Sequence, residues 1–278
     1  MKTSLILRCT VCGESRLSLW GKRNDFHLYE CKNCTHRFAD LLGREFSKSD
    51  PIKFRQELTH GLMDSDRNYY LHLKVGELPG NATYITATRA ISICKRAGIE
   101  KGAWLDVGSG SGYLLSKAKE NGYTAIGIEP GGWGQLAAQE KGVTVKQAFL
   151  EPTTFDQTFD IVSATDVIEH VANPVQFLRT LRQYTNPNGG LVFSIPCADS
   201  FEGRIFGVHW DMVEPPTHSQ FFSHTSLAKV LLMSGFRMEE CEQFSVRPFL
   251  GLGSLPPIRA VIDAFLDGPQ LVGFARPI

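Results

Sequence analysis

The chain has 278 residues, of which 42% are apolar, 10% are aromatic and 21% are charged. This composition excludes an intrinsically disordered chain, which has few hydrophobic residues and a large net charge. The length is sufficient to bury the core of one large domain or two unequal ones. Lys plus Arg and Asp plus Glu number 29 each, so the formal net charge is zero. A neutral chain argues against a protein that binds long polyanions such as nucleic acids.

Targeting and membrane signals are not evident in the sequence. No stretch approaches the ~18 consecutive apolar residues of a membrane-spanning helix. The N-terminal sequence MKTSLILRCT has an apolar run of only three residues, whereas a secretory signal peptide needs roughly 7–15. We therefore expect a cytoplasmic protein, in which a cluster of cysteines indicates metal binding or catalysis rather than disulfides.

Four of the seven cysteines form two Cys-x2-Cys pairs separated by 18 residues: Cys9, Cys12, Cys31 and Cys34. This spacing is typical of a zinc ribbon, in which two tight turns present four thiolates to one Zn²⁺ ion. Residues 17–20 and 26–29 alternate as two strands joined by a turn at 21–25. Four sulfur ligands leave no open position, so the zinc would be structural. The alternative is two disulfides or unliganded thiols, and His27 and His36 are expected to be surface or packing residues.

The rest of the chain divides into a connector and an α/β domain. Residues 43–83 are polar and aromatic without a clear period, which favours a connector or lid with short helices. After a helix at 84–97, short strands and helices alternate to the C-terminus. The expected strands are 103–107, 124–128, 143–146, 159–164, 191–195, 237–246 and 271–275. The expected helices are 113–121, 133–141, 175–184, 226–234 and 260–266. This alternation predicts an α/β fold with a mostly parallel sheet and helices on both faces.

A glycine-rich turn follows the first of these strands, with the sequence LDVGSGSG at 105–112. Glycines here allow positive φ angles and let a ligand approach the backbone. The dinucleotide fingerprint G-x-G-x-x-G would need a glycine at position 113, which is Tyr113. Asp106 precedes the turn, where a carboxylate would repel a pyrophosphate but suits a cationic ligand such as S-adenosylmethionine, whose amino acid end carries an ammonium group.

Glu129 ends the second expected strand, 21 residues after Gly108. A carboxylate at this place can accept hydrogen bonds from both hydroxyls of a ribose, as in dinucleotide-binding folds. Glu129 therefore fits either cofactor, and Asp106 favours S-adenosylmethionine. The alternative is that the glycines only form a turn and that Glu129 is solvated.

These motifs, with four more, resemble the class I S-adenosylmethionine-dependent methyltransferases over residues 84–278. The further stretches are GIEP at 127–130, DVIEHVANP at 166–174, GGLVFSIP at 189–196 and THSQFFSHTSLAKVLLMSGF at 217–236. The most similar variety carries an N-terminal Cys-x2-Cys ribbon and acts in small-molecule and sugar metabolism. The resemblance implies a Rossmann-like sheet in the order 3-2-1-4-5-7-6 whose last strand, 271–275, is antiparallel. An additional helical stretch at 249–268 departs from that pattern.

The resemblance also implies roles for single residues. Asp106, Gly108 and Gly110 would line the methionine end of the cofactor, and Glu129 would hold the ribose. The remaining cofactor contacts would be Phe149 and Leu150 near the adenine and Asp166 near the methyl group. Ligands of open α/β sheets bind at the carboxyl ends of the strands, where these residues fall.

Methyl transfer needs mainly an aligned nucleophile and the removal of one proton. The candidate bases are His170, His209, His218 and His224. His218 is preferred, because its loop should cover the cofactor and its pKa range suits proton transfer near neutrality. The expected catalytic residues are thus His218, His170 and Asp166. Trp210 would form the floor of an acceptor pocket or anchor its loop.

Asp166, Glu169 and His170 have the i, i+3, i+4 spacing that places side chains on one face of a helix. Similar acidic-x-x-Glu-His segments bind a divalent ion in some O-methyltransferases of quinones and small RNAs. The alternative is that Glu169 and His170 form hydrogen bonds with neighbouring loops.

The sequence therefore predicts an S-adenosylmethionine-dependent methyltransferase with a structural Zn²⁺ ribbon at 1–42. Its acceptor would be a sugar, a lipid-linked intermediate or a secondary metabolite, with O-methylation favoured over N- or C-methylation. An RNA methyltransferase whose ribbon grips RNA is disfavoured by the neutral charge and the lack of a Lys/Arg-rich stripe. A non-catalytic zinc-ribbon binding protein is disfavoured by the intact Asp106, Gly108, Gly110 and Glu129. The oligomeric state is left open.

Overall fold

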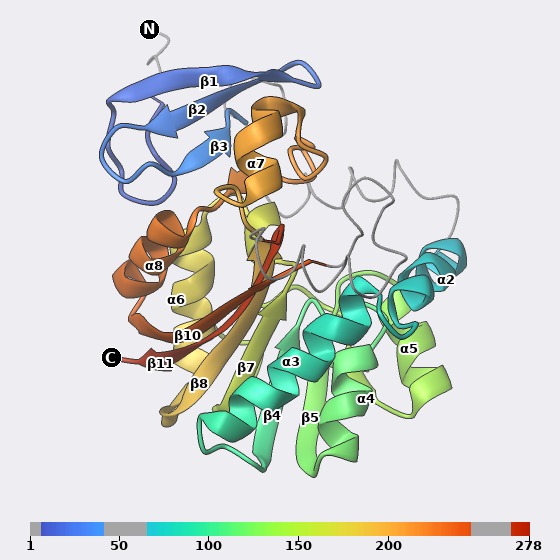
Figure 1. Cartoon of the computed structure of the whole chain (residues 1–278). Coiled ribbons are helices and arrows are strands. Elements are labelled where there is room, and N and C mark those ends of the chain that lie inside the picture. The colour runs from blue at the N-terminus through green and yellow to red at the C-terminus, as the bar shows by residue number, and fades with distance from the viewer. Residues whose placement is uncertain (1–6, 42–65, 246–267) are drawn as a thin grey trace, which may run out of the picture.

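The computed structural model describes residues 7–41, 66–245 and 268–278 (Figure 1). Their strands form two sheets, one of four strands in the order β1-β2-β3-β9 and one of seven in the order β10-β11-β8-β7-β4-β5-β6. The smaller sheet lies at one end of the larger one (Figure 1). Within the described residues, no helix is long and apolar enough to cross a membrane.

The smaller sheet contains the two cysteine pairs. Strands β1 (Leu17–Arg23) and β2 (Phe26–Cys31) form an antiparallel hairpin, which confirms the two strands predicted between the pairs. The turn is narrower than the predicted 21–25, because β1 continues to Arg23 and only Asn24 and Asp25 adopt positive φ angles, 47° and 64°. Strand β3 (Arg37–Ala39) continues the sheet. It has too few residues to show a period in the sequence.

The larger sheet has the strand order that the resemblance to the methyltransferases implies. Its strands are β4 (Gly102–Val107), β5 (Tyr123–Ile128), β6 (Thr144–Lys146), β7 (Phe159–Thr165), β8 (Thr185–Pro196), β10 (Phe236–Phe244) and β11 (Gln270–Pro277). Numbered within this sheet along the chain, they lie in the order 3-2-1-4-5-7-6. Strand β11 is antiparallel to both of its neighbours, β8 and β10, which confirms the antiparallel last strand.

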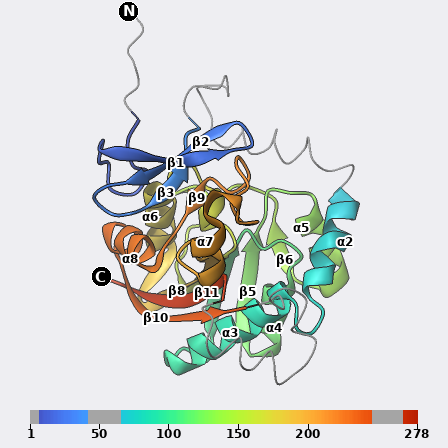
Figure 2. The same ribbon diagram turned by 45° about the horizontal axis from the view of Figure 1, so that its top comes forward.

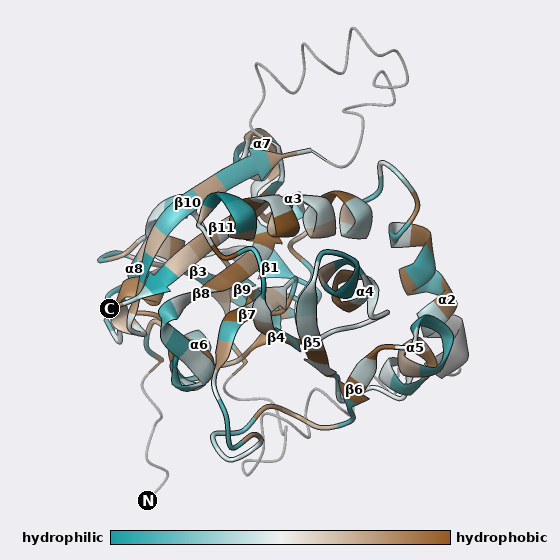
Figure 3. Cartoon of the chain, turned by 90° about the horizontal axis from the view of Figure 1, so that it is seen from below, coloured by the Kyte–Doolittle hydropathy of each residue, from teal (hydrophilic) through white to brown (hydrophobic). Residues whose placement is uncertain are grey.

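Helices cover both faces of this sheet, as Figure 3 shows in a view along the strands. They are α2 (Asp66–Gly76), α3 (Ala82–Arg96), α4 (Tyr113–Glu120), α5 (Trp133–Lys141), α6 (Pro174–Tyr184), α7 (Phe201–Phe206) and α8 (His224–Met233), with 3-10 turns η1 (Ile168–His170) and η2 (Gly207–His209). Adjacent residues of a strand point to opposite faces. Trp104 packs with α3 and α4, whereas Leu105 packs with α6 and α8.

The ribbon and the α/β body share one hydrophobic core. Strand β9 (Gln220–Phe221) belongs to the body segment after β8 but lies beside β3 of the ribbon (Figure 2) and pairs with it. In this pairing Phe38 lies opposite Gln220. Cys31 and Phe38 belong to the same buried cluster as Leu105 of the body. The ribbon is therefore fixed on the body by backbone pairing and by packing. The predicted helix at 260–266, most of the stretch at 249–268 and residues 43–65 of the connector lie outside the described residues.

Candidate active site

A cavity of about 970 Å³ opens at the carboxyl ends of strands β4, β5 and β7. It is lined by every residue to which the sequence analysis assigned a cofactor contact: Asp106, Gly108, Gly110, Glu129, Phe149, Leu150 and Asp166. His170 and His218 line the same cavity. Residues of α2 and α3, such as His72 and Thr86, also line it, and no motif had pointed to them. Segments far apart in the chain therefore form one site.

The backbone at Gly108 leaves no room for a side chain. Its φ is +73°, and a Cβ atom there would lie 2.6 Å from Cγ2 of Val167. Gly110 has a φ of +51° and also needs the conformational freedom of glycine. The turn can therefore bend between β4 and α4 and leave its backbone open to the cavity.

Glu129 connects this turn to the end of β5. Its side chain is buried, and its Oε2 and Oε1 atoms accept hydrogen bonds from the backbone N–H groups of Gly110, at 3.0 Å, and Gly131, at 2.9 Å. A carboxylate oxygen can accept more than one hydrogen bond. Glu129 is thus held in one orientation at the wall of the cavity.

Asp106 is buried below the glycine turn, where its Oδ1 accepts a 2.6 Å hydrogen bond from the hydroxyl of Ser163. Burial is the main cause that raises the pKa of Asp106 to about 7, and the charge of Glu129 adds to it, whereas the Ser163 bond acts in the opposite direction. Near neutral pH this carboxyl group exists in both protonation states. A cation beside it would stabilise the ionised form.

Asp166 lies at the end of β7 with its side chain open to the cavity. Its φ is +55°, an uncommon value for a residue other than glycine. The backbone N–H donates to the carbonyl of Ser194 at 2.9 Å, and Oδ1 accepts from the hydroxyl of Ser194, also at 2.9 Å, and from Gln270. The surrounding walls desolvate the carboxylate and so raise the pKa of Asp166, against the effect of these hydrogen bonds. Strained, well-bonded residues of this kind cluster at functional sites.

The rings of His170 and His218 meet edge to face, with centroids 4.7 Å apart. Nδ1 of His218 lies 2.8 Å from the carbonyl oxygen of Met212, and Nδ1 of His170 lies 2.8 Å from that of Thr217. A carbonyl only accepts, so each Nδ1 carries the proton and donates it. In the neutral rings each Nε2 is therefore the basic nitrogen.

Glu169 completes a group of three ligand-type side chains with these two histidines. One ligand atom from each lies within 4.8 Å of the others, and Glu169 is buried. Asp166 is not part of this group, because its positive φ precedes η1 and directs its carboxylate to Ser194 and Gln270 instead. The shared face expected for Asp166, Glu169 and His170 is thus replaced by a cluster that includes His218.

The other candidate bases do not line this cavity. His209 lies in η2, and His224 begins α8 beside Asp199. Trp210 is buried in a cluster between ribbon and body, where it packs with Phe26, and its indole N–H lies 3.3 Å from Oε2 of Glu202. The structure therefore makes Trp210 an anchor of its loop.

The four ribbon cysteines lie together. Sγ of Cys9 is 3.6 Å from that of Cys34, and Sγ of Cys12 is 3.5 Å from that of Cys31. The hydrogen bond with Cys34 is the main cause that lowers the pKa of Cys9 to about 5, and the same contact raises the pKa of Cys34. His27 is exposed, and His36 is buried in packing contacts, so neither belongs to the cysteine cluster.

Comparison with known proteins matches residues 84–240 to the methyltransferase domain family. The ubiquinone biosynthesis O-methyltransferase of Azorhizobium caulinodans is 31% identical over 160 residues, which cover 53% of this chain and 63% of that protein. The enzyme of the same name from Saccharophagus degradans is 28% identical over 168 residues, which cover 55% of this chain and 70% of that protein. The match thus spans a little less than two thirds of the first of these relatives.

A solved structure has the same fold: the 1,6-didemethyltoxoflavin-N1-methyltransferase of Burkholderia thailandensis, with S-adenosylhomocysteine bound. It superimposes with a TM-score of 0.56 at 14% identity, covering 89% of this chain and 98% of that one. The fold is that of the class I S-adenosylmethionine-dependent methyltransferases. The chain belongs to the methyltransferase domain family.

Proposed function

We propose that this enzyme transfers a methyl group from S-adenosylmethionine to an oxygen atom of a small-molecule acceptor. The observation that carries the proposal is the meeting, in one cavity, of Asp106 and Glu129 with the anchored histidines His170 and His218. The names of the two O-methyltransferase relatives support oxygen as the methylated atom. A sugar, a lipid-linked intermediate or a secondary metabolite fits this class of acceptor.

The residues around the glycine turn fit the cofactor. Asp106 would face its ammonium group, Glu129 its ribose, and Phe149 with Leu150 its adenine. The cofactor would supply an electrophilic methyl group bonded to a sulfonium sulfur. Asp106 and Glu129 fix the orientation of that group, and orientation contributes more to such a reaction than any single proton transfer. Asp166 would lie at the methyl end.

The acceptor hydroxyl must lose its proton as the new C–O bond forms. Nε2 of His218 is the basic nitrogen of a ring held at Nδ1 by Met212, so it can take this proton. The ring of His170 packs against that of His218, with the ring centroids 4.7 Å apart. An alternative use of the same side chains is a divalent cation held by Glu169, His170 and His218, whose ligand atoms lie within 4.8 Å of one another.

The four ribbon cysteines fit a structural Zn²⁺ ion. Tetrahedral zinc with Zn–S bonds of about 2.3 Å separates sulfur atoms by about 3.8 Å. The two closest pairs are already 3.5 and 3.6 Å apart. We also propose the division into a ribbon at 1–42, a connector at 43–83 and a cofactor-binding domain at 84–278.

An acceptor screen tests the function. The purified chain is incubated with S-adenosylmethionine carrying a labelled methyl group and with phenols, sugars, lipid-linked alcohols, amines or RNA, each with and without EDTA. Glu129→Ala serves as the inactive control. We expect transfer to a hydroxyl group, seen as an O-methyl product by mass spectrometry, that persists in EDTA. Transfer only to amines or to RNA would overturn the proposal, and loss of activity in EDTA that returns with Mg²⁺ or Mn²⁺ would assign the histidines to a metal.

A further inference from the structure

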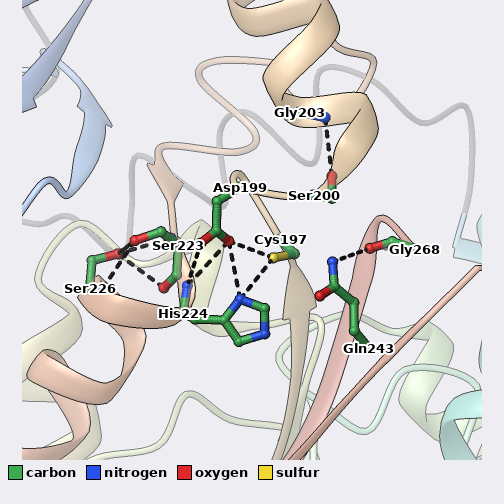
Figure 4. Close-up of polar contacts among 9 residues, drawn as sticks. All are labelled: Cys197, Asp199, Ser200, Gly203, Ser223, His224, Ser226, Gln243 and Gly268. Atoms are coloured by element: carbon green, nitrogen blue, oxygen red, sulfur yellow. Dashed lines mark hydrogen bonds and ion pairs between the residues drawn. The ribbon is translucent and has the colours of Figure 1, made fainter. Parts of the chain in front are cut away.

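A second cluster of ligand-type side chains lies outside the cavity (Figure 4). Cys197 follows the last residue of β8, Asp199 comes two residues later, and His224 is the first residue of α8. One ligand atom from each lies within 4.8 Å of the other two. None of the three lines the proposed active site.

The three polar atoms converge on one point. Sγ of Cys197 lies 2.8 Å from Oδ1 of Asp199 and 3.7 Å from Nδ1 of His224, and that nitrogen lies 3.2 Å from the same Oδ1 (Figure 4). In a catalytic relay the carboxylate and the nucleophile contact opposite nitrogens of the imidazole. Here both contact Nδ1. The arrangement therefore differs from a nucleophilic triad and has the form of a coordination site.

The distances agree with those of a metal ion's ligands. Tetrahedral coordination with bonds of about 2.0–2.3 Å to nitrogen, oxygen and sulfur separates the ligand atoms by about 3.3–3.6 Å. The contacts at 3.7 and 3.2 Å are already close to these values. The 2.8 Å contact is shorter, and in it the thiol of Cys197 donates its proton to Oδ1 of Asp199. A metal ion would replace that proton, which leaves to solvent on binding.

The backbone holds the three residues in place. The backbone N–H of Cys197 donates to the carbonyl of Pro269 at 2.9 Å, and Asp199 also accepts from the backbone N–H of His224 at 3.3 Å. The N-terminus of α8 is fixed by a capping box of Ser223 and Ser226 (Figure 4). A site whose ligands are fixed before binding loses less entropy when it binds.

We propose that Cys197, Asp199 and His224 bind a second Zn²⁺ ion, with a water molecule as its fourth ligand. One thiolate, one imidazole and one carboxylate form a donor set that suits zinc better than the hard cations Mg²⁺ and Ca²⁺. Cys197 is fully buried, whereas the side chains of Asp199 and His224 are 38% and 41% exposed, so the fourth position faces solvent.

The position of this site indicates its role. Cys197 and His224 bracket residues 198–223, the segment that contains α7, His218 and the strand β9 that pairs with the ribbon. A metal ion bound to Cys197 and His224 would link the two ends of this segment to each other. The second zinc is therefore expected to stabilise the segment that joins ribbon and active site, and the proposal does not depend on the identity of the acceptor.

Metal content of the full-length protein tests the proposal. The protein is freed of metal with a chelator under reducing conditions, reloaded with Zn²⁺, desalted and analysed for zinc. We expect about two ions per chain for the wild type and about one for Cys197→Ser or His224→Ala. The matched control is Cys94→Ser, a fully buried cysteine of α3 in the other core cluster, which should retain about two. Cys31→Ser should lose the zinc ion of the four-cysteine site and keep the second zinc ion, which Cys197→Ser loses.

A cobalt titration gives a second, spectroscopic reading of the two sites. Co²⁺ at the four-cysteine site has absorption from four thiolates, whereas Co²⁺ at the second site has absorption from only one. We expect two phases, with much less thiolate-to-cobalt absorption in one than in the other, and loss of that weaker phase in Cys197→Ser. A folded wild type that binds a single ion, lost in Cys31→Ser and unchanged in Cys197→Ser, would overturn the proposal.

Discussion

Nε2 of His36 lies 2.9 Å from Oε1 of Gln220, across the junction of ribbon and body. The same Oε1 accepts a 2.7 Å hydrogen bond from the hydroxyl of Thr10 in the first cysteine turn. His36 is fully buried, and this burial lowers its pKa to about 4, so the neutral ring donates from Nε2. Gln220 is two residues from His218. The ribbon therefore contacts the segment that carries the proposed base.

Gln220→Ala should destabilise the protein. It leaves the buried Nε2–H of His36 and the hydroxyl of Thr10 without their acceptor, and an unsatisfied buried polar group costs about 1–3 kcal/mol. Chemical denaturation should show this loss. The exposed Gln157→Ala is the control and should change the free energy of unfolding by less than about 0.5 kcal/mol. Equal stability of the two variants would contradict the role of this contact.

Cys31→Ser should remove the ribbon zinc, lower the melting temperature and reduce turnover. Cys31 is fully buried in the core that ribbon and body share, so loss of the metal disturbs both. A structural zinc contributes its binding free energy to folding. Elemental analysis, thermal unfolding and kcat are the three measurements. An unchanged zinc content in this variant would contradict the assignment of the four cysteines as ligands of a structural zinc ion.

Glu129→Ala should weaken binding of S-adenosylhomocysteine by about tenfold or more, since hydrogen bonds to a charged group contribute about 1.5–3 kcal/mol. The carboxylate also holds the N–H groups of Gly110 and Gly131, so a small loss of thermal stability is expected as well. Isothermal titration calorimetry measures the affinity. The exposed Glu100→Ala is the matched control, and equal affinity of both variants would refute the ribose contact.

Asp106 should make cofactor binding depend on pH. Its folded-state pKa is raised to about 7, from 3.8, chiefly by burial. Its contribution to stability is therefore fully present below pH 3.8 and is lost as the pH rises through about 7. An ammonium group prefers the ionised carboxylate, so the affinity for S-adenosylhomocysteine should increase between pH 6 and 8. Near pH 6, binding should release a proton from Asp106. Isothermal titration calorimetry in buffers of different ionisation enthalpy measures how many protons are released on binding.

The control for this prediction is Asp106→Asn, which keeps the size of the side chain and cannot ionise. It should bind more weakly at pH 8 and lose the pH dependence. A wild-type affinity that stays constant from pH 6 to 8 would contradict the assignment of Asp106 to the ammonium group.

The sequence predicted the parts that depend on local pattern. The alternation of strands and helices predicted the α/β class, the resemblance to the methyltransferases implied the strand order, and residues next to strand ends, such as Glu129, line the cavity as expected. Contacts between distant segments leave no local pattern. The pairing of β9 with β3 joins Gln220 to Phe38, and the contact of His170 with His218 depends on how two loops meet.

Asp166 shows a second limit of prediction from spacing. Its i, i+3, i+4 relation to Glu169 and His170 assumes a helix, whereas the chain has a φ of +55° at Asp166 and only a short 3-10 turn after it. This conformation is stabilised by hydrogen bonds with Ser194 and Gln270, which come from two other strands. No property of residues 166–170 alone indicates those partners.

His218→Ala should reduce kcat by about 10²-fold or more and leave the affinity for S-adenosylhomocysteine unchanged, since positioned general bases contribute about 10²–10⁴-fold. His209→Ala is the control, because His209 does not line the cavity. A wild-type rate in His218→Ala would leave His170 as the base, whereas a parallel loss of cofactor affinity would indicate that the loop holds the cofactor instead of the proton.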